Sequence, residues 1–292
     1  MGSRRTAVIT GGTSGIGEAI ATRLAASMTV IIVGRSDERL SQARQRIRDA
    51  TPDTDVRAER VDLAELADVR ALANRLADDP PDVVISNAAT IPHANDVRTG
   101  ALPRAVTTNH LAPYLLLRSL VAPIDERPAR FVVVGADPSM LRLAPVDLDD
   151  VTCVTGRGLG PVPSFRPFVA YGRTKNMNAM FVYALAGRLA GSKITVNGAH
   201  PGIIPGTGLS RNGRGAMRAF DMLLRANPVR TKVDAGADTP VWLATSPEVD
   251  NVNGRFFVHR KEVRTAEHTT DRARCDRLWD ISADLVGLPR AL

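Results

Sequence analysis

The chain has few of the features that mark a secreted, metal-binding or membrane-spanning protein. Its two cysteines, Cys153 and Cys275, are too few for a metal cluster or a disulfide framework, so we expect no bound metal. No apolar run approaches the roughly 18 residues that a membrane-spanning helix needs, and the N-terminus lacks the apolar core of a signal peptide. We therefore expect a cytoplasmic protein in a reducing compartment, with no membrane partner.

Aromatic residues and lysines are also scarce: aromatics make up 4% of the chain, and only four of the 38 basic residues are lysines. The formal net charge is +7, yet the arginines are spread along the chain and no run of five like charges occurs. A nucleic-acid surface gathers its positive charge on one face or stretch. The composition therefore argues against a nucleic-acid partner. The positive electrostatic potential that results from the net charge favours a phosphorylated cofactor.

Apolar runs of strand length alternate with helical patterns along the whole chain. The runs that we expect to form strands are Ala7–Ile9, Val30–Val33, Val83–Ile85, Phe131–Val134, Ile194–Val196 and Phe256–Val258, and we expect a further short strand through Val56 and Val61. Such alternation predicts an α/β fold with a single doubly wound (Rossmann) parallel sheet and helices on both faces. Because no repeat or linker interrupts the pattern, we expect one domain over residues 1–292.

Two stretches depart from this alternation. Residues 136–169 lose all periodicity and carry Asp, Pro and Gly, which is typical of a long functional loop. Residues 203–230 combine glycines with an amphipathic patch, which suits either a small lid over an apolar substrate or a helix that always stays packed.

A glycine-rich stretch, Thr10-Gly11-Gly12-Thr13-Ser14-Gly15-Ile16-Gly17, joins the first expected strand to the first expected helix. Glycines let such a turn adopt left-handed backbone conformations and remove the β-carbons that would keep a ligand away. The free N–H groups at the start of the helix then face an anion, such as a dinucleotide pyrophosphate. The turn residues that we expect at this cofactor are Gly11, Thr13, Ser14, Gly15, Ile16 and Gly17. An ordinary strand-to-helix turn with chance glycines is the alternative.

Arg35 follows the second expected strand, where a dinucleotide places its adenosine ribose. An acidic residue there favours the free 2′-hydroxyl of NAD(H), whereas a guanidinium group pairs with a 2′-phosphate. The position of Arg35 therefore predicts NADP(H) as the cofactor. A solvated loop arginine is the alternative if the turn binds no nucleotide.

Further motifs follow along the chain: Asp62, Asn87-Ala88-Ala89, Asn109, Tyr171-x-x-x-Lys175 and Pro201-Gly202. Together with the glycine turn they resemble the short-chain dehydrogenase/reductase family over nearly the whole chain, a joint match far more specific than any one motif. Residues 254–288 and the long loop before Tyr171 look most like the retinol-dehydrogenase-like branch. Members of that branch often carry a membrane anchor, and we expect none here.

Tyr171 and Lys175 are four residues apart and therefore share one face of an expected helix. An ammonium group one turn away favours the phenolate, which brings the pKa of the tyrosine toward the working range of an acid or base. The resemblance implies that Tyr171 exchanges the proton with the substrate oxygen, that Lys175 also holds the nicotinamide ribose, and that Asn109 supports a water relay to Lys175. Without the other motifs, the pair would be interpreted as a surface contact.

The resemblance also implies the remaining cofactor contacts and the mode of association. Asp62 would bond to the adenine, and the segment after the sixth strand would lie along the nicotinamide. The remaining cofactor residues are Asp62, Leu63, Asn87, Ala88, Pro201, Gly202 and Ile204. Members of the family associate through the two long helices that hold Asn109 and Tyr171, so both a monomer and a homodimer stay open.

The sequence departs from the family at the serine that holds the substrate carbonyl, because the matching position is Ala136. Losing one such donor costs on the order of 3 kcal/mol in the transition state. A turn after Ala136 could bring the hydroxyl of Ser139 to the same place, although a helix or turn cap is the favoured role for Ser139. Thr152 and Thr155 are more remote candidates, and a phenol next to the substrate carbonyl could also supply the bond.

These features favour an NADPH-dependent ketone reductase, or the reverse alcohol dehydrogenase, with a small-molecule substrate. We expect a bulky, mostly apolar substrate such as a polyketide-like secondary metabolite. Two alternatives stay open because one fold hosts several chemistries. The first is a non-redox enzyme such as a dehydratase, cyclase or isomerase, and the second is a catalytically weakened NADP(H)-binding regulatory protein.

Overall fold

The computed structural model describes residues 4–91, 102–202 and 232–292, and the predicted lid lies outside these ranges. The described residues contain one eight-stranded sheet with the order β3-β2-β1-β4-β5-β6-β7-β8. Its strands are β1 (Thr6–Thr10), β2 (Thr29–Gly34), β3 (Val56–Arg60), β4 (Val83–Ser86), β5 (Ala129–Val134), β6 (Ile194–His200), β7 (Phe256–Val258) and β8 (Lys261–Glu262). The first seven are parallel, which confirms the doubly wound sheet predicted from the sequence. The short antiparallel β8 was not predicted, because two exposed residues carry no pattern.

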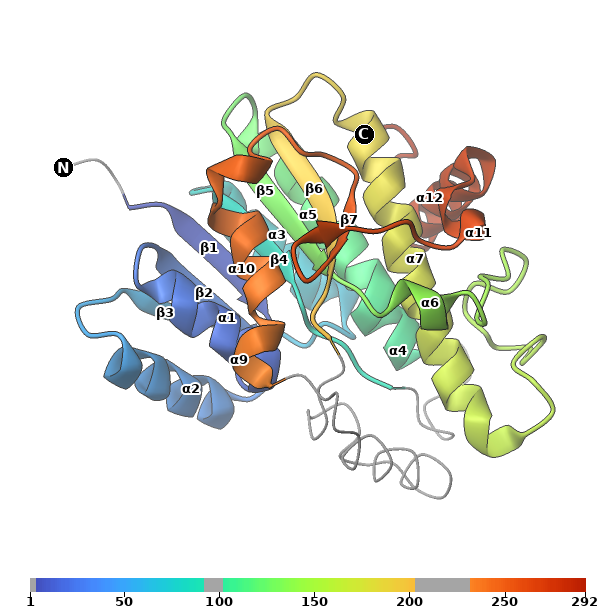
Figure 1. The fold of residues 1–292 in the computed structure, drawn as a ribbon, viewed down its shortest axis with the longest axis horizontal. Helices are drawn as coiled ribbons and strands as arrows, with labels where there is room; N and C mark the ends of the chain where they lie inside the picture. Colours follow the sequence, from blue (N-terminus) through green and yellow to red (C-terminus); the bar gives the residue numbers. More distant parts are fainter. Residues whose placement is uncertain (1–3, 92–101, 203–231) are drawn as a thin grey trace.

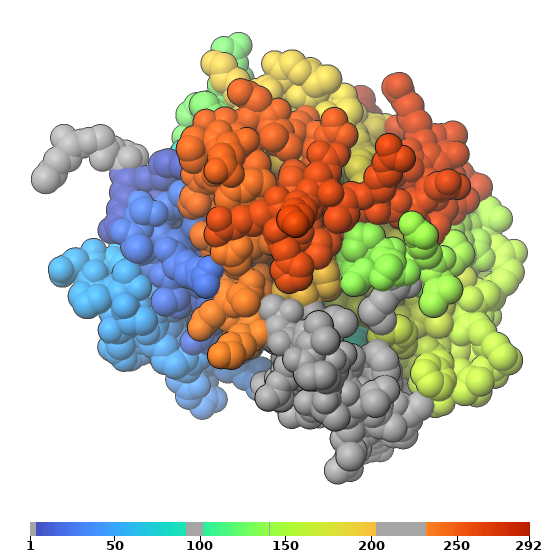
Figure 2. All heavy atoms as spheres, viewed as in Figure 1, coloured from blue at the N-terminus to red at the C-terminus, as the bar shows by residue number. Residues whose placement is uncertain are grey.

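Helices cover both faces of the sheet (Figure 1). In chain order the helical elements are α1 (Gly15–Ala25), α2 (Asp37–Ala50), α3 (Leu66–Ala77), α4 (Arg104–Val106), the π-helix η1 (Thr107–Leu111), α5 (Ala112–Ile124), α6 (Pro138–Leu141), the 3₁₀-helix η2 (Pro163–Phe165), α7 (Arg166–Arg188), α9 (Val233–Gly236), α10 (Asp238–Thr245), the 3₁₀-helix η3 (Pro247–Val249), α11 (Glu267–Thr270) and α12 (Arg272–Val286). Helices α1, α2 and α10 pack on one face, and α3, α5 and α7 pack on the other. Seen from the side of α10, atoms of the C-terminal elements, coloured orange to red, cover the middle of the molecule (Figure 2).

The alternation of side chains along each strand divides the core into two layers. Val8 of β1 packs in the layer beneath α3, α5 and α7, whereas its neighbour Ile9 packs beneath α1, α2 and α10. Both side chains are fully buried. Central strands of a parallel sheet therefore need apolar residues on both faces, and this is the origin of the continuous apolar runs in the sequence.

The strand order reverses between β1 and β4, which pair directly in the middle of the sheet. The connections that leave these two strands run to opposite sides, so a crevice opens at their carboxyl ends. The turn that begins with Gly11 leaves β1 at this point, and the segment that begins with Asn87 leaves β4. The fold thus brings two motifs that are far apart in the sequence to one edge.

Helix α7 begins at Arg166, inside the stretch of residues 136–169 that the sequence predicted to be a loop. Pro167 occupies the first turn, where its missing N–H costs no hydrogen bond and its fixed φ favours the helix. The segment between β5 and α7 contains α6 and η2 but is otherwise irregular, in keeping with the predicted loop. Tyr171 consequently lies within α7 and not at its frayed end.

Helix α12 packs against α7 and η1 on the outer side of the molecule (Figure 1). The hydroxyl of Tyr114 donates to the carbonyl of Trp279 at 2.7 Å, and His110 Nε2 lies 2.8 Å from the hydroxyl of Ser282. Among the described helices, none has both the length and the apolar character required to cross a bilayer. The described residues also contain no group of three or more side chains placed to bind a metal.

Candidate cofactor and active site

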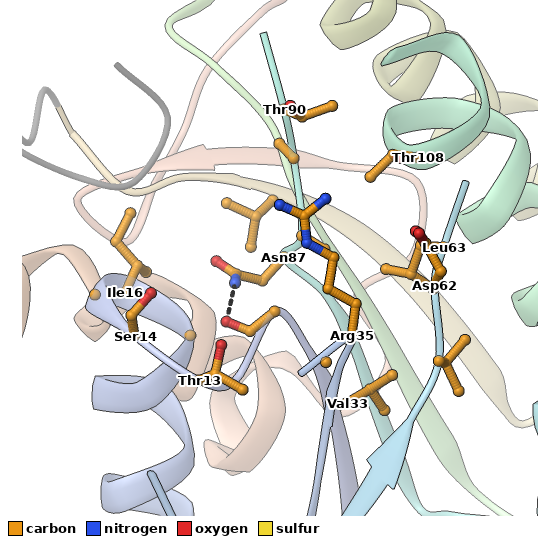
Figure 3. A pocket seen from close by; sticks show the side chains of 18 of the residues that line it. Thr13, Ser14, Ile16, Val33, Arg35, Asp62, Leu63, Asn87, Thr90 and Thr108 are labelled. Atoms are coloured by element: carbon orange, nitrogen blue, oxygen red, sulfur yellow. Dashed lines mark hydrogen bonds between the residues drawn. The ribbon is translucent and has the colours of Figure 1, made fainter. Parts of the chain in front are cut away.

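A cavity of about 320 Å³ opens at the carboxyl edge of the sheet, a size typical of small-molecule sites. The glycine turn forms one wall, with Thr13, Ser14 and Ile16 on one side of the view in Figure 3 and Asp62 and Leu63 on the other. The opposite end is closed by residues of β5 and α7. The cavity therefore lies at the reversal of strand order, where doubly wound sheets bind ligands.

The glycines of the turn are each needed for a different structural reason. Gly11 and Gly15 have φ of +68° and +57°, which side-chain-bearing residues adopt only with strain. A β-carbon on Gly17 would lie 2.2 Å from the carbonyl oxygen of Gly11, so α1 could not pack this closely against the turn. A β-carbon on Gly15 would meet none of the described residues within 4 Å, and Gly15 lines the cavity.

The first turn of α1 presents backbone donors to this cavity. Ser14 is the N-cap residue, yet its side chain makes no capping hydrogen bond, so among the described residues the first N–H groups of the helix have no side-chain partner. Unpartnered N–H groups and the positive end of the helix dipole bind a phosphate well. The uncapped helix and the open position at Gly15 fit the pyrophosphate of a dinucleotide.

Asn87 and Thr10 fasten the end of β4 to the end of β1. The hydroxyl of Thr10 accepts from the N–H groups of Asn87 and Ala88 at 3.0 and 3.1 Å. The side-chain amide of Asn87 donates to the carbonyls of Thr10 at 3.0 Å and of Gly11 at 3.4 Å, the second of which is drawn in Figure 3. Asn87 therefore fixes the glycine turn as well as lining the cavity.

Arg35 extends into the cavity from the end of β2 (Figure 3). Within the part of the chain that the structure describes, its guanidinium group makes no hydrogen bond or ion pair. Arg39, at the start of α2, lines the same part of the cavity and was not singled out from the sequence. A pair of cationic side chains at the ribose end fits a 2′-phosphate.

Tyr171 and Lys175 both line the cavity from α7. Lys175 is buried, its ammonium group donates to the carbonyl of Val134 at 2.9 Å, and its Nζ lies 5.7 Å from the centroid of the Tyr171 ring. Burial raises the pKa of Tyr171 above its ordinary value of 10 and lowers the pKa of Lys175 to about 8. This differs from the expected lowering of the tyrosine pKa, because burial disfavours the charged phenolate.

Asn109 lies in the π-helical turn η1 and is buried. Its side-chain oxygen accepts from the N–H of Thr90 at 2.8 Å, while its amide nitrogen donates to the carbonyl of Thr90 at 2.8 Å and to the hydroxyl of Thr174 at 2.9 Å. Asn109 does not line the cavity. Its side chain holds Thr90, which does line the cavity, and both of its amide hydrogens are used in these bonds. The water relay to Lys175 stays a prediction.

Asp62 lines the cavity after β3, but its carboxylate is paired with Arg104. Burial raises the pKa of Asp62, and the hydrogen bonds from Arg104 and the Ala64 amide, with the charges of Arg104 and Arg35, lower it by more. The carboxylate is therefore ionised at neutral pH. Arg104 was not identified from the sequence, because its contact with Asp62 joins residues that are distant in the chain.

The position of the family serine has no hydroxyl group, since Gly135 lines the cavity and Ala136 follows it. Ser139 is exposed, and its N–H and hydroxyl both donate to the Asp137 carboxylate, at 2.8 and 2.7 Å. The hydroxyl of Thr155 donates to Asp150 at 2.5 Å. Neither Ser139 nor the two threonines, Thr152 and Thr155, line the cavity, so their placement gives no support to a role in replacing the serine.

Most of the residues predicted to bind the cofactor meet at this cavity: Gly11, Thr13, Ser14, Gly15, Ile16, Gly17, Arg35, Asp62, Leu63, Asn87, Ala88, Tyr171, Lys175 and Pro201. Gly202 does not line it, and Ile204 lies outside the described residues. Sequence reasoning missed Ser36, Arg39, Val61, Arg104 and Thr108, among others. Arg39 lies in the first turn of α2, four residues after Arg35, and this closeness in the sequence is a signal that could have identified it.

Comparison with known proteins agrees with this geometry. The model of the short chain dehydrogenase family matches residues 5–140. Human "Retinol dehydrogenase 14" is 32% identical, and the alignment covers 97% of this chain and 87% of the human protein. A protein of Streptomyces sp. (strain C5) named "Putative daunorubicin C-13 ketoreductase DnrU" is 34% identical, with coverage of 97% and 93%.

A solved structure from Beutenbergia cavernae superposes with a TM-score of 0.67. It is described as a "putative NAD(P) dependent gluconate 5-dehydrogenase" with "bound NADP (low occupancy)". The two sequences are 27% identical, and the match covers 88% of this chain and 95% of the other. The superposition extends the likeness beyond the first half of the fold to the part that holds α7.

Proposed function

Because the chain belongs to the short-chain dehydrogenase/reductase family, in the retinol-dehydrogenase-like branch, we propose that this oxidoreductase is an NADP(H)-dependent ketoreductase, or the reverse alcohol dehydrogenase. The observation that carries the proposal is the presence of four elements around one cavity: the glycine turn, Arg35, Tyr171 and Lys175. A nucleotide fold alone would not need the tyrosine and the lysine beside the same cavity.

The proposed roles follow from the chemistry of each group. The glycine turn and the first N–H groups of α1 hold the pyrophosphate, and Arg35 holds the 2′-phosphate. The bound cofactor supplies hydride chemistry. In the reductive direction Tyr171 gives its phenolic proton to the substrate oxygen, and the ammonium group of Lys175 stabilises the phenolate that remains.

The preference for NADP(H) is supported by the charge of the site. The guanidinium group of Arg35 makes no hydrogen bond or ion pair among the described residues, and Arg39 lines the same cavity. The Beutenbergia cavernae structure with bound NADP is consistent with this choice. An acidic residue, which would favour NAD(H), is absent from the position of Arg35.

The proposed substrate is a bulky, mostly apolar ketone, such as a polyketide-like secondary metabolite. The segment between Gly135 and Tyr171, both of which line the cavity, exposes the large apolar side chains of Leu143, Val162 and Phe165. The Streptomyces relative carries the name "Putative daunorubicin C-13 ketoreductase DnrU", which supports a ketone substrate. The exposed side chains beside the cavity support its apolar character.

The direct test is binding of NADPH and NADH to the purified protein, followed by turnover on a panel of aromatic ketones and alcohols. We expect tighter binding of NADPH and a fall of about a hundredfold or more in turnover for Tyr171→Phe, with NADPH binding retained. Unchanged turnover in Tyr171→Phe would remove the catalytic assignment.

Ala136 favours one further candidate, a non-redox enzyme on the same fold, because the carbonyl-holding serine is missing. Substrate consumption without any change in the absorbance of the reduced nicotinamide would select this alternative. Tight NADPH binding with no turnover across the panel would instead indicate a regulatory protein that binds NADP(H).

A further inference from the structure

The adenine end of the cavity contains an ion pair between Asp62 and Arg104. Asp62 follows β3, and Arg104 is the first residue of α4, directly before the π-helical turn that carries Asn109. Arg104 Nη2 lies 2.8 Å from both carboxylate oxygens of Asp62. Each side chain is about one-third exposed, and both line the cavity. The pair therefore forms part of the surface that a bound nucleotide meets.

The carboxylate of Asp62 has little accepting capacity left. Besides the two contacts from Arg104, Oδ1 accepts from the N–H of Ala64 at 3.1 Å. A carboxylate offers about four acceptor sites, so three of them are already used. The guanidinium group of Arg104, by contrast, makes no other hydrogen bond in the part of the chain that the structure describes, and its Nε and Nη1 donors stay available.

This arrangement changes what the site offers to a purine base. A lone carboxylate accepts hydrogen bonds only, so it favours the 6-amino group of adenine and repels the 6-oxo group of hypoxanthine. A carboxylate paired with a guanidinium group presents an acceptor and several donors side by side. We propose that Arg104 is a specificity-determining residue of the cofactor site, which makes the site tolerant of either an amino or an oxo group at position 6 of the purine.

The inference depends on the proposed function only in that NADP(H) binds this cavity with its base beside Asp62. Arg104 acts on the base directly through its free donors and indirectly by neutralising Asp62. Removing the guanidinium group should therefore have opposite effects on the two bases. Affinity for the adenine cofactor should hold or increase, and affinity for the hypoxanthine cofactor should fall.

The test is a comparison of NADPH with reduced nicotinamide hypoxanthine dinucleotide phosphate, whose nicotinamide fluorescence reports binding without turnover. For the unaltered protein we expect the two dissociation constants to agree within about threefold. In Arg104→Met the dissociation constant of the hypoxanthine cofactor divided by that of NADPH should rise about tenfold or more. This is the size expected for the loss of one charge-assisted hydrogen bond. Asp62→Asn in the Arg104→Met background should return the ratio toward one, because a side-chain amide both donates and accepts.

Arg75→Met provides the matched control, since it removes an arginine that is ion-paired with Glu59 at 2.7 Å and does not line this cavity. It should leave the ratio unchanged. If Arg104 has only a structural role, Arg104→Met will weaken both cofactors equally, and the constant ratio overturns the inference while NADPH binding leaves the proposed function intact. Failure of the unaltered protein to bind NADPH would overturn the proposed function and the inference together.

Discussion

The side-chain amide of Asn109 forms hydrogen bonds to both backbone groups of Thr90, accepting from its N–H and donating to its carbonyl, each at 2.8 Å. The contact imitates the pairing of two strands and fixes the segment that leaves β4 beside the cavity. A further bond at 2.9 Å joins Asn109 to Thr174, next to Lys175 on α7. Asn109 thereby links two walls of the site.

Replacing Asn109 by alanine should destabilise the protein by about 2–4 kcal/mol, because the N–H and carbonyl of Thr90 lose their partner and the buried hydroxyl of Thr174 loses a donor. Chemical denaturation measures this loss directly. NADPH affinity should fall as well, since Thr90 lines the cavity. Gln45→Ala removes an exposed amide from α2 and should change stability by less than about 0.5 kcal/mol. Equal stability of the two variants would contradict the linking role of Asn109.

Arg35→Ala should raise the dissociation constant for NADPH about tenfold or more and leave that for NADH within about twofold. The reason is that a guanidinium group forms charge-assisted hydrogen bonds with a 2′-phosphate, which NADH lacks. Titration calorimetry with both cofactors measures the two constants. Arg44→Ala removes the same charge from α2 away from the cavity and should affect neither. If Arg35→Ala weakens the binding of NADPH and NADH equally, Arg35 does not contact the 2′-phosphate.

Ala136→Ser should restore the donor that the sequence lacks. For an aromatic ketone without a phenol group we expect kcat/KM to increase by about a hundredfold, because one such donor typically contributes a rate factor of this size. For the same ketone with a phenol beside the carbonyl, the increase should be much smaller, because the substrate already supplies that hydrogen bond. Ala136→Gly changes the side-chain volume without adding a donor and serves as the control. Equal increases in kcat/KM for both ketones would show that the phenol of the substrate does not replace the missing hydrogen-bond donor.

Ketone reduction should be favoured at neutral pH and decline above a pH of about 8. Burial raises the pKa of Tyr171, so the phenol keeps the proton that reduction requires. Burial also lowers the pKa of Lys175 to about 8, so its stabilising positive charge is present below that pH and is lost above it. A pH profile of kcat/KM at saturating NADPH tests this. In Lys175→Met the overall rate should be low and the decline near pH 8 should disappear.

The protein should be a monomer of 31.3 kDa by light scattering. In the family, dimers use the helices that hold Asn109 and Tyr171, but here α12 packs against η1 and α7. Trp279 on α12 is buried and accepts a hydrogen bond from Tyr114 through its carbonyl. A dimer that persists at nanomolar concentration would contradict this expectation and point to another surface.

Local patterns in the sequence sufficed for much of this site. The apolar runs identified six of the seven parallel strands, because a strand buried on both faces must be apolar throughout. The exception is β3 (Val56–Arg60), which is partly exposed and carries charged residues. The glycine turn and the spacing of Tyr171 and Lys175 were also readable, since each depends on backbone geometry over a few residues. The chain's parallel order then required their meeting at one edge of the sheet.

Only the tertiary structure decided which side chains the functional groups meet. The pairing of Asp62 with Arg104, the bonds from Asn109 to Thr90, and the exposed position of Ser139 have no local pattern in the sequence. The direction of the Tyr171 pKa shift belongs to the same class. The contacts depend on where the long connections of the fold place residues that are distant in the sequence. The pKa shift depends on how completely folding excludes water from the side chain. Neither property is encoded within a single turn or strand.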